Sequence, residues 1–281
     1  MYNLTSISDV RDLLNTQGIK PKHGLGQNFL IDNNVVSNIA KSVLESGPYG
    51  LEIGPGLGVL TSRMGDLEEL VCVETDRDML KCLNITCEGM ENLSVLNKDF
   101  LKVDLNEILK SDRKYVAYGN LPYYITTPII IKLLENKHYF NSVVMMVQKE
   151  VGDRIKAGPC SKDYGALSVF VQFYGKVTTV CNVSPNCFYP PPCVSSVVVK
   201  IDLYDKPLFE VNEKLFFGIV RAAFGKRRKT LLNALSNSEF LEFSKEDVEK
   251  FLNQAGIDKN LRGETLSLED FAKICKCITL C

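Results

Sequence analysis

Short apolar strands alternate with helical patterns along most of this 281-residue chain, and that alternation most constrains its fold. The sequence predicts strands at 51–53, 69–74, 93–97, 115–118 and 142–147, and helices at 6–17, 32–45, from 76 onwards and at 127–136. Two β-branched segments, 177–183 and 196–203, add strands on either side of a proline-rich stretch. Strands that alternate with helices favour a mostly parallel α/β sheet with helices on both faces, a Rossmann-like architecture.

The pattern changes after Pro207, where strand signals give way to helical ones. The segments 212–223, 228–236, 245–255 and 267–277 all have helical patterns. We therefore predict two domains, an α/β domain at 1–207 and a small all-α C-terminal domain at 208–281.

Polar or glycine residues follow the predicted strands in order: Gly54, Glu74, Asp99 and Asn120. The stretch 52–58 has a glycine at every second position from Gly54, and glycines let a backbone turn sharply close to a ligand. Glu74 lies about twenty residues further on, where an acid can hold ribose hydroxyls. Because open α/β sheets bind ligands beyond the carboxyl ends of their strands, we expect these four residues on one rim. A structural glycine turn with solvent-facing acids is the alternative.

The stretch Asn120-Leu121-Pro122-Tyr123 predicts a hydrogen-bonding clamp followed by an aromatic face. The Asn120 carboxamide offers an accepting oxygen, and Pro122 stiffens the turn. Tyr123 supplies a surface on which a nucleobase can stack. Such a group could hold the exocyclic amine of a flipped-out base. These four residues alone fit a proline-centred turn equally well.

The composition argues against a membrane-spanning protein, an exported protein and a metalloprotein. Hydrophobic residues make up 45% and charged residues 24%, which is typical of a soluble globular protein, and there is no apolar run of bilayer length or signal-peptide pattern. The ten cysteines are scattered, so we expect reduced thiols in a cytoplasmic protein. Cys275, Cys277 and Cys281 lack a common zinc spacing, and only two histidines are present, so no metal is expected.

Net charge is −1, so affinity for nucleic acid requires local basic patches. Two candidate patches stand out, and solvated basic faces are the alternative for both. The residues expected to contact RNA are Lys20, Lys22, Arg221, Lys226, Arg227, Arg228 and Lys229, with the last four expected to begin a helix.

These motifs together resemble a known family. LEIGPGLG at 51–58, VETD at 73–76, KDF at 98–100 and NLPY at 120–123 resemble the S-adenosylmethionine (SAM) site of class I methyltransferases that modify adenine N6. GQNFL at 26–30, QKEVGDR at 148–154, SKDYGALS at 161–168 and FYPPP at 188–192 resemble the ribosomal RNA adenine dimethyltransferase family. FGKRRKTL at 224–231 is similar to the helical domain of its bacterial small-subunit members. The resemblance covers about residues 10–277.

The resemblance implies a function and a set of roles. The family members in question make N6,N6-dimethyladenosine at two adjacent adenosines near the 3′ end of 16S rRNA, with SAM as cofactor and S-adenosylhomocysteine as product. The implied catalytic residues, which would hold the adenine that accepts the methyl group, are Asn120, Leu121, Pro122, Tyr123 and Phe188. Of these, Tyr123 and Phe188 would sandwich the target adenine. The implied cofactor residues are Asn28, Leu30, Gly54, Gly56, Glu74, Asp99 and Asn120. By the same resemblance Glu74 would hold the ribose of SAM and Asp99 its adenine. Relatives often carry a smaller polar residue at the position of Tyr124.

Three alternatives remain open at this point. The family relative that methylates large-subunit (23S) rRNA and confers macrolide resistance shares most of the motifs. A non-catalytic ribosome-assembly or RNA-binding factor could keep the fold, and a DNA adenine methyltransferase would need a DNA-reading domain that the sequence does not display. The small-subunit interpretation further implies a monomer that binds the small ribosomal subunit precursor and no membrane.

Overall fold

A computed structural model describes residues 2–22, 24, 26–226 and 228–279. The chain forms two compact units, 1–152 with 176–205 and 153–175 with 206–281. The break at Asp205 and Lys206 lies close to the predicted boundary at 207. The segment 153–175 belongs to the second unit, which the sequence did not lead us to expect.

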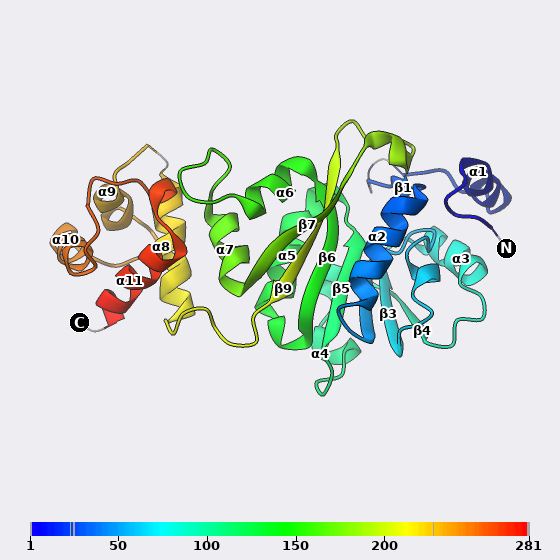
Figure 1. The fold of residues 1–281 in the computed structure, drawn as a ribbon, viewed down its shortest axis with the longest axis horizontal. Coiled ribbons are helices and arrows are strands. Elements are labelled where there is room, and N and C mark those ends of the chain that lie inside the picture. The colour runs from blue at the N-terminus through cyan, green and yellow to red at the C-terminus, as the bar shows by residue number, and fades with distance from the viewer. Residues whose placement is uncertain (1, 23, 25, 227, 280–281) are drawn as a thin grey trace. The chain divides into compact units, whose positions relative to one another are not determined.

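Within the described residues of the first unit, seven strands form one sheet in the order β4-β3-β2-β5-β6-β9-β7. Neighbouring strands from β4 to β6 run parallel, and β9 is antiparallel to β6 (Figure 1). The strands are β2 (Tyr49–Ile53), β3 (Glu69–Glu74), β4 (Leu93–Asn97), β5 (Tyr115–Asn120), β6 (Phe140–Gln148), β7 (Gly175–Val183) and β9 (Ser196–Leu203). The predicted α/β class with a mostly parallel sheet is confirmed.

Helices cover both faces of this sheet, with α2 in front of it and α5 behind it in Figure 1. The helices are α1 (Ile7–Thr16), α2 (Asn33–Leu44), α3 (Arg77–Thr86), α4 (Leu105–Ile108), α5 (Thr126–Glu135) and α6 (Lys149–Lys156), the last of which spans the break between the units. The Asp32 carboxylate caps α2 by accepting from the Val35 amide at 3.0 Å, as predicted. On the α2 side, Ile39 and Val43 pack in one buried cluster with Tyr118 and Met146 of the sheet.

A second, two-stranded sheet links distant parts of the first unit. Strand β1 (Phe29–Leu30) pairs antiparallel with β8 (Phe188–Tyr189), so that Leu30 lies opposite Phe188. This pairing brings the predicted N-terminal cofactor segment to the start of the proline-rich stretch, which sequence patterns alone did not show.

The second unit is helical and packs around aromatic side chains. Its helices are α7 (Ala166–Tyr174), α8 (Glu213–Gly225), α9 (Leu231–Ser236), α10 (Lys245–Gln254) and α11 (Leu268–Thr279). The rings of Phe173 and Phe216 lie 4.7 Å apart, and Phe224 packs against Phe271 at 6.0 Å. The all-α character of the C-terminal region is confirmed. The expectation that the basic cluster begins a helix is wrong for its described members Lys226, Arg228 and Lys229, because α8 ends at Gly225 and α9 starts only at Leu231, after the N-cap residue Thr230.

Candidate active site

The carboxyl ends of the parallel strands surround a cavity of about 290 Å³ in the first unit. All of the residues predicted to bind the cofactor line it: Asn28, Leu30, Gly54, Gly56, Glu74, Asp99 and Asn120. Much of the remaining wall is apolar and includes Leu57, Leu101, Ile125 and Ile129. Residues that follow different strands are therefore brought to one rim.

The turn after β2 gives the cavity its floor. Gly54 and Gly56 have φ values of +68° and +58°, which side-chain-bearing residues rarely adopt. A Cβ added at Gly54 would meet no atom within 4 Å, so the backbone there faces open space. The Gly56 amide donates to Glu74 Oε2 at 3.1 Å, which joins this turn to the end of β3.

Glu74 is 6% exposed and receives a second hydrogen bond from the Asp76 amide at 2.8 Å. Burial raises the pKa of its carboxyl, and the two amide donors counteract part of that effect. Asp99 accepts from the Leu101 amide at 3.0 Å and so caps the 3₁₀ turn Phe100–Lys102. Both acids present oxygen acceptors toward the cavity.

Glu52 is a cavity residue that the sequence analysis did not assign to the site. It is 1% exposed, and its Oε2 accepts from Thr61 Oγ1 at 2.8 Å and from the Tyr118 hydroxyl at 3.1 Å. Burial raises the pKa of this carboxyl to about 7. The signal available in the sequence was a charged residue inside an otherwise apolar strand.

The acceptor loop, residues 120–124, borders the same cavity through Asn120, Pro122 and Tyr124. The Asn120 amide Nδ2 donates to the Asn28 carbonyl at 2.9 Å, which fixes the carboxamide and leaves Oδ1 to accept from a ligand. Leu121 is buried, with its amide donating to Met146 O at 3.3 Å.

The three aromatic residues near this loop are placed differently. Tyr123 is half-buried, and its hydroxyl lies 2.8 Å from Ser196 Oγ. Phe188 is 3% exposed and belongs to the cluster of buried residues beneath α2. Neither is part of the cavity lining, whereas Tyr124 lines the cavity and is 61% exposed. The sandwich of Tyr123 and Phe188 around a target base stays a prediction.

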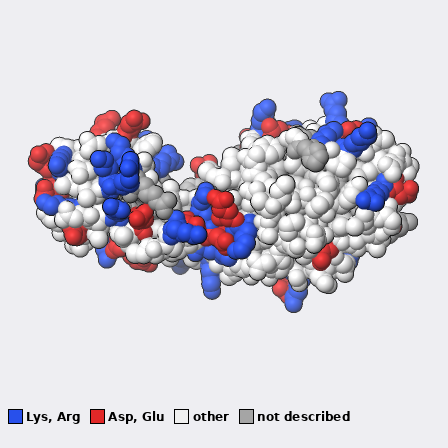
Figure 2. All heavy atoms as spheres, turned by 90° about the horizontal axis from the view of Figure 1, so that it is seen from above, with Lys and Arg blue, Asp and Glu red and all other residues white. Residues whose placement is uncertain are grey.

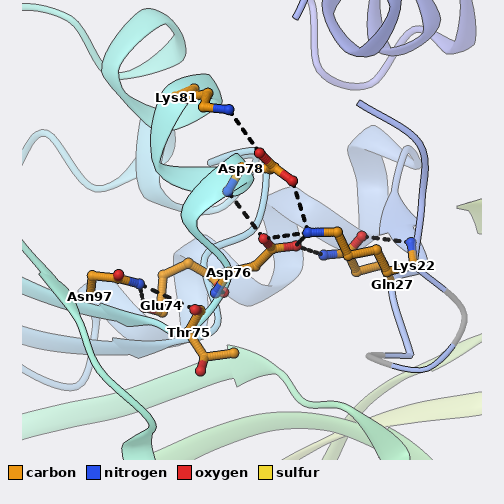
Figure 3. Close-up of polar contacts among 8 residues, drawn as sticks. All are labelled: Lys22, Gln27, Glu74, Thr75, Asp76, Asp78, Lys81 and Asn97. Carbon is orange, nitrogen blue, oxygen red and sulfur yellow. Dashed lines mark hydrogen bonds and ion pairs between the residues drawn. The ribbon is translucent and has the colours of Figure 1, made fainter. Parts of the chain in front are cut away.

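Polar contacts tie the N-terminal segment to the turn after β3 (Figure 3). The Lys22 ammonium contacts Asp76 Oδ1 at 2.7 Å and Asp78 Oδ2 at 2.8 Å, and Gln27 Nε2 donates to Asp76 Oδ2 at 2.7 Å. Asp76 is almost fully buried, and its contact with Lys22 lowers its pKa despite the opposing effect of burial. Lys22 was expected to bind RNA, but its charge is directed at two carboxylates.

The other predicted RNA contacts that the structure describes are exposed. Figure 2 shows Lys and Arg side chains gathered on a face of the helical unit. The described members of the predicted basic cluster are all exposed: Arg221, Lys226, Arg228 and Lys229. Lys20 is exposed in the first unit, and Arg227 lies outside the described residues.

The residues that line the cavity match the chemical groups of SAM. SAM carries a sulfonium cation, ribose hydroxyls and an adenine, so it needs a close-approach backbone turn, carboxylate acceptors and apolar walls. The Gly54 turn, the acids Glu74 and Asp99 and the aliphatic wall supply these features. Among the described residues, no group of three or more His, Cys, Asp and Glu side chains could hold a metal ion. The fold and the cavity together define a SAM-dependent methyltransferase of the class I type.

Comparison with known proteins narrows this class. Residues 18–280 match the model of the ribosomal RNA adenine dimethylase family, and the chain belongs to that family. It is 43% identical over 269 residues to ribosomal RNA small subunit methyltransferase A of Clostridium acetobutylicum, covering 95% of this chain and 96% of the relative. It is 42% identical to the protein of the same name from Clostridioides difficile, covering 97% of this chain and 96% of the relative.

Solved structures agree with the fold. A dimethyladenosine transferase from Plasmodium falciparum superposes with a TM-score of 0.74 at 28% identity, covering 87% of this chain and 95% of the other. The 23S rRNA methyltransferase ErmE superposes with a TM-score of 0.69 at 24% identity, covering 90% of this chain and 100% of the other, and supports the fold alone. This chain is a SAM-dependent rRNA adenine dimethyltransferase.

Proposed function

We propose that this enzyme dimethylates N6 of two adjacent adenosines near the 3′ end of 16S rRNA in the small ribosomal subunit. The observation that carries the proposal is the fixed Asn120 carboxamide at the rim of the SAM cavity, 2.9 Å from the Asn28 carbonyl. The target is supported by the near full-length similarity to small-subunit methyltransferases, whereas the likeness to the 23S enzyme ErmE extends to the fold alone. An intact acceptor loop argues against a non-catalytic assembly factor.

The residues of the acceptor loop would activate the amine by accepting hydrogen bonds from its N–H groups, and the methylated nitrogen would then lose one proton to water. Adenine N6 is a weak nucleophile because its lone pair is delocalised into the ring. Asn120 Oδ1 and one backbone carbonyl would accept the two N–H groups and favour a pyramidal nitrogen. The Pro122 carbonyl already accepts from the Ile125 amide and Thr126 Oγ1, both at 3.2 Å, so the Leu121 carbonyl is the better second acceptor.

Bound SAM supplies an activated methyl group, so the protein's task is alignment rather than strong acid–base catalysis. Tyr123 would hold the base by stacking, with its hydroxyl fixed by Ser196. Phe188 would reach the base only after a side-chain rearrangement, because it is buried. The second methyl transfer requires space for an amine that already bears one methyl group.

We assign SAM binding and catalysis to residues 1–207, and rRNA recognition to 208–281 with its exposed basic residues. We also propose that the enzyme is a cytoplasmic monomer. In the part of the chain that the structure describes, no helix has both the length and the apolar character needed to span a bilayer.

One experiment tests the target. Purified protein and labelled SAM are incubated with small subunits that lack the modification, with large subunits and with plain DNA, and the modified base is mapped by reverse transcription. Two dimethylated adenosines near the 3′ end of 16S rRNA are expected. Label in 23S rRNA instead would favour the resistance-type activity, and no transfer to any substrate would favour an assembly factor.

A further inference from the structure

One cation on α5 joins the two sides of the cavity. Lys132 lies on the helix that follows the acceptor loop. Its ammonium donates to the backbone carbonyls of Phe100 at 2.8 Å and Leu101 at 3.1 Å, and also to that of Val103. The same nitrogen lies 5.2 Å from the centre of the Phe100 ring.

The segment held in this way forms part of the cofactor wall. Phe100 and Leu101 line the cavity beside Asp99, whose carboxylate caps the same 3₁₀ turn. Within the turn the Phe100 carbonyl accepts from the Val103 amide at 3.3 Å, whereas the carbonyls at the end of so short a turn need donors from outside it. A lysine ammonium has three donors, which matches the three carbonyls that it reaches.

The half-buried Lys132 ammonium has a lowered pKa. Burial lowers the pKa of Lys132, while the nearby carboxylates of Asp104 and Asp99 act in the opposite direction. A neutral side chain of similar length would remove this donor from the carbonyls of Leu101 and Val103, and a buried carbonyl that loses its partner is costly.

We propose that Lys132 is a positioning residue that fixes the segment 99–103 as the adenine-side wall of the SAM cavity and ties it to the helix behind the acceptor loop. The inference rests on the SAM site and on the predicted role of Asp99 toward adenine. It does not depend on which RNA is methylated. Lys132, which belongs to none of the sequence motifs, would therefore contribute to the affinity for SAM.

Lys132→Met removes the charge at similar length. We expect it to raise the KM for SAM by about tenfold with kcat within about twofold, because hydrogen bonds to a charged group are the stronger class. Affinity for S-adenosylhomocysteine and for 5′-methylthioadenosine, measured by calorimetry, should fall by the same factor, because both contain the adenosine part. Lys132→Arg, which keeps a charged donor, should recover most of the affinity. The exposed Glu135 on the same helix provides the control Glu135→Gln, which should bind as the unmodified protein does.

Hydrogen exchange of the SAM-free protein supplies a readout independent of activity. In Lys132→Met, amides at 100–104 should exchange faster while those of β5 and β6 keep their rates. Unchanged ligand affinity, or faster exchange throughout the first unit, would overturn the proposal. If Lys132→Met does not fold, Lys132→Gln carries the same test. If the unmodified protein binds S-adenosylhomocysteine but does not methylate small subunits, the proposed target fails and the inference about Lys132 stands.

Discussion

The Asn120 side chain is anchored to the main-chain carbonyl of Asn28, a residue 92 positions earlier in the chain. Asn28 precedes β1, and Asn120 ends β5, so the bond joins the N-terminal segment to the acceptor loop. The amide nitrogen is used in this contact, and the oxygen of Asn120 is thereby oriented as an acceptor. The cofactor side and the acceptor side of the cavity therefore share one fixed group.

Asn120→Ala should lower kcat for methyl transfer by about 100-fold or more, because it removes a fixed group that acts on the amine in the transition state. Binding of S-adenosylhomocysteine and of small subunits should change much less. Single-turnover transfer and calorimetry measure the two effects. Asn84→Ala, at an exposed position of α3, is the control. A variant at Asn120 with near-normal turnover would refute the clamp.

Two substitutions separate the role of the Tyr123 ring from that of its hydroxyl. Tyr123→Phe keeps the stacking face but leaves Ser196 Oγ, in a residue that is 1% exposed, without this partner. It should cost about 1 kcal/mol of unfolding free energy and little turnover. Tyr123→Ala should weaken the transition-state interaction with the base by about 1–3 kcal/mol. Urea unfolding and kcat/KM measure these losses; equal loss of turnover in both variants would mean that the hydroxyl, not the ring, matters.

Much of the fold could be predicted from the sequence because the local residue pattern agrees with the tertiary environment. The strand 69–74 was predicted with its observed bounds, since an apolar run between acids suits a buried parallel strand. The order of strand ends also placed Gly54, Glu74, Asp99 and Asn120 on one cavity. Parallel strands put their carboxyl ends on the same edge, so this juxtaposition follows from topology.

The features that were missed depend on contacts between distant segments. Helix α7 was not predicted, because its apolar and aromatic residues lack a polar face, and it is stabilised by aromatic packing with α8. The pairing of Leu30 with Phe188 joins residues far apart in the chain. The partners of Lys22 and Lys132 were likewise invisible, because a charged residue in a sequence carries no sign of the group that it meets.

The ion pairs of Lys22 distinguish this lysine from the exposed basic residues of the helical unit. Lys22→Met should weaken SAM binding, because the N-terminal segment is then no longer tied to Asp76 by an ion pair, and should leave the salt dependence of subunit binding unchanged. The double variant Arg228→Glu, Lys229→Glu should leave SAM binding unchanged and should reduce the salt dependence of subunit binding. Removal of each side chain that binds a phosphate should reduce the slope of log affinity against log salt by about 1.

Filter binding of small subunits at a series of salt concentrations and calorimetry with S-adenosylhomocysteine compare these variants. Lys41→Met, at an exposed position of α2, is the control for loss of one positive charge. A reduced salt slope for Lys22→Met would restore its predicted role as an RNA contact.

Glu52 should make stability depend on pH. Its pKa is about 7 in the folded protein because of burial, against 4.5 for the ordinary side chain. Between these values the folded state holds more protons than the unfolded state, so the free energy of unfolding falls as pH rises from about 4.5 to about 7. The contribution of the protonated form is fully present below that range and is lost above it.

Glu52→Gln removes this titration and keeps an oxygen that can accept from Thr61 and Tyr118. We expect the variant to gain stability relative to the unmodified protein as pH rises from 5 to 8, by an amount on the order of 3 kcal/mol at most. Urea unfolding at several pH values provides the comparison, with Glu88→Gln as the exposed control. If Glu52→Gln and the unmodified protein show parallel pH profiles, Glu52 is ionised across the whole range and the buried acid does not control stability.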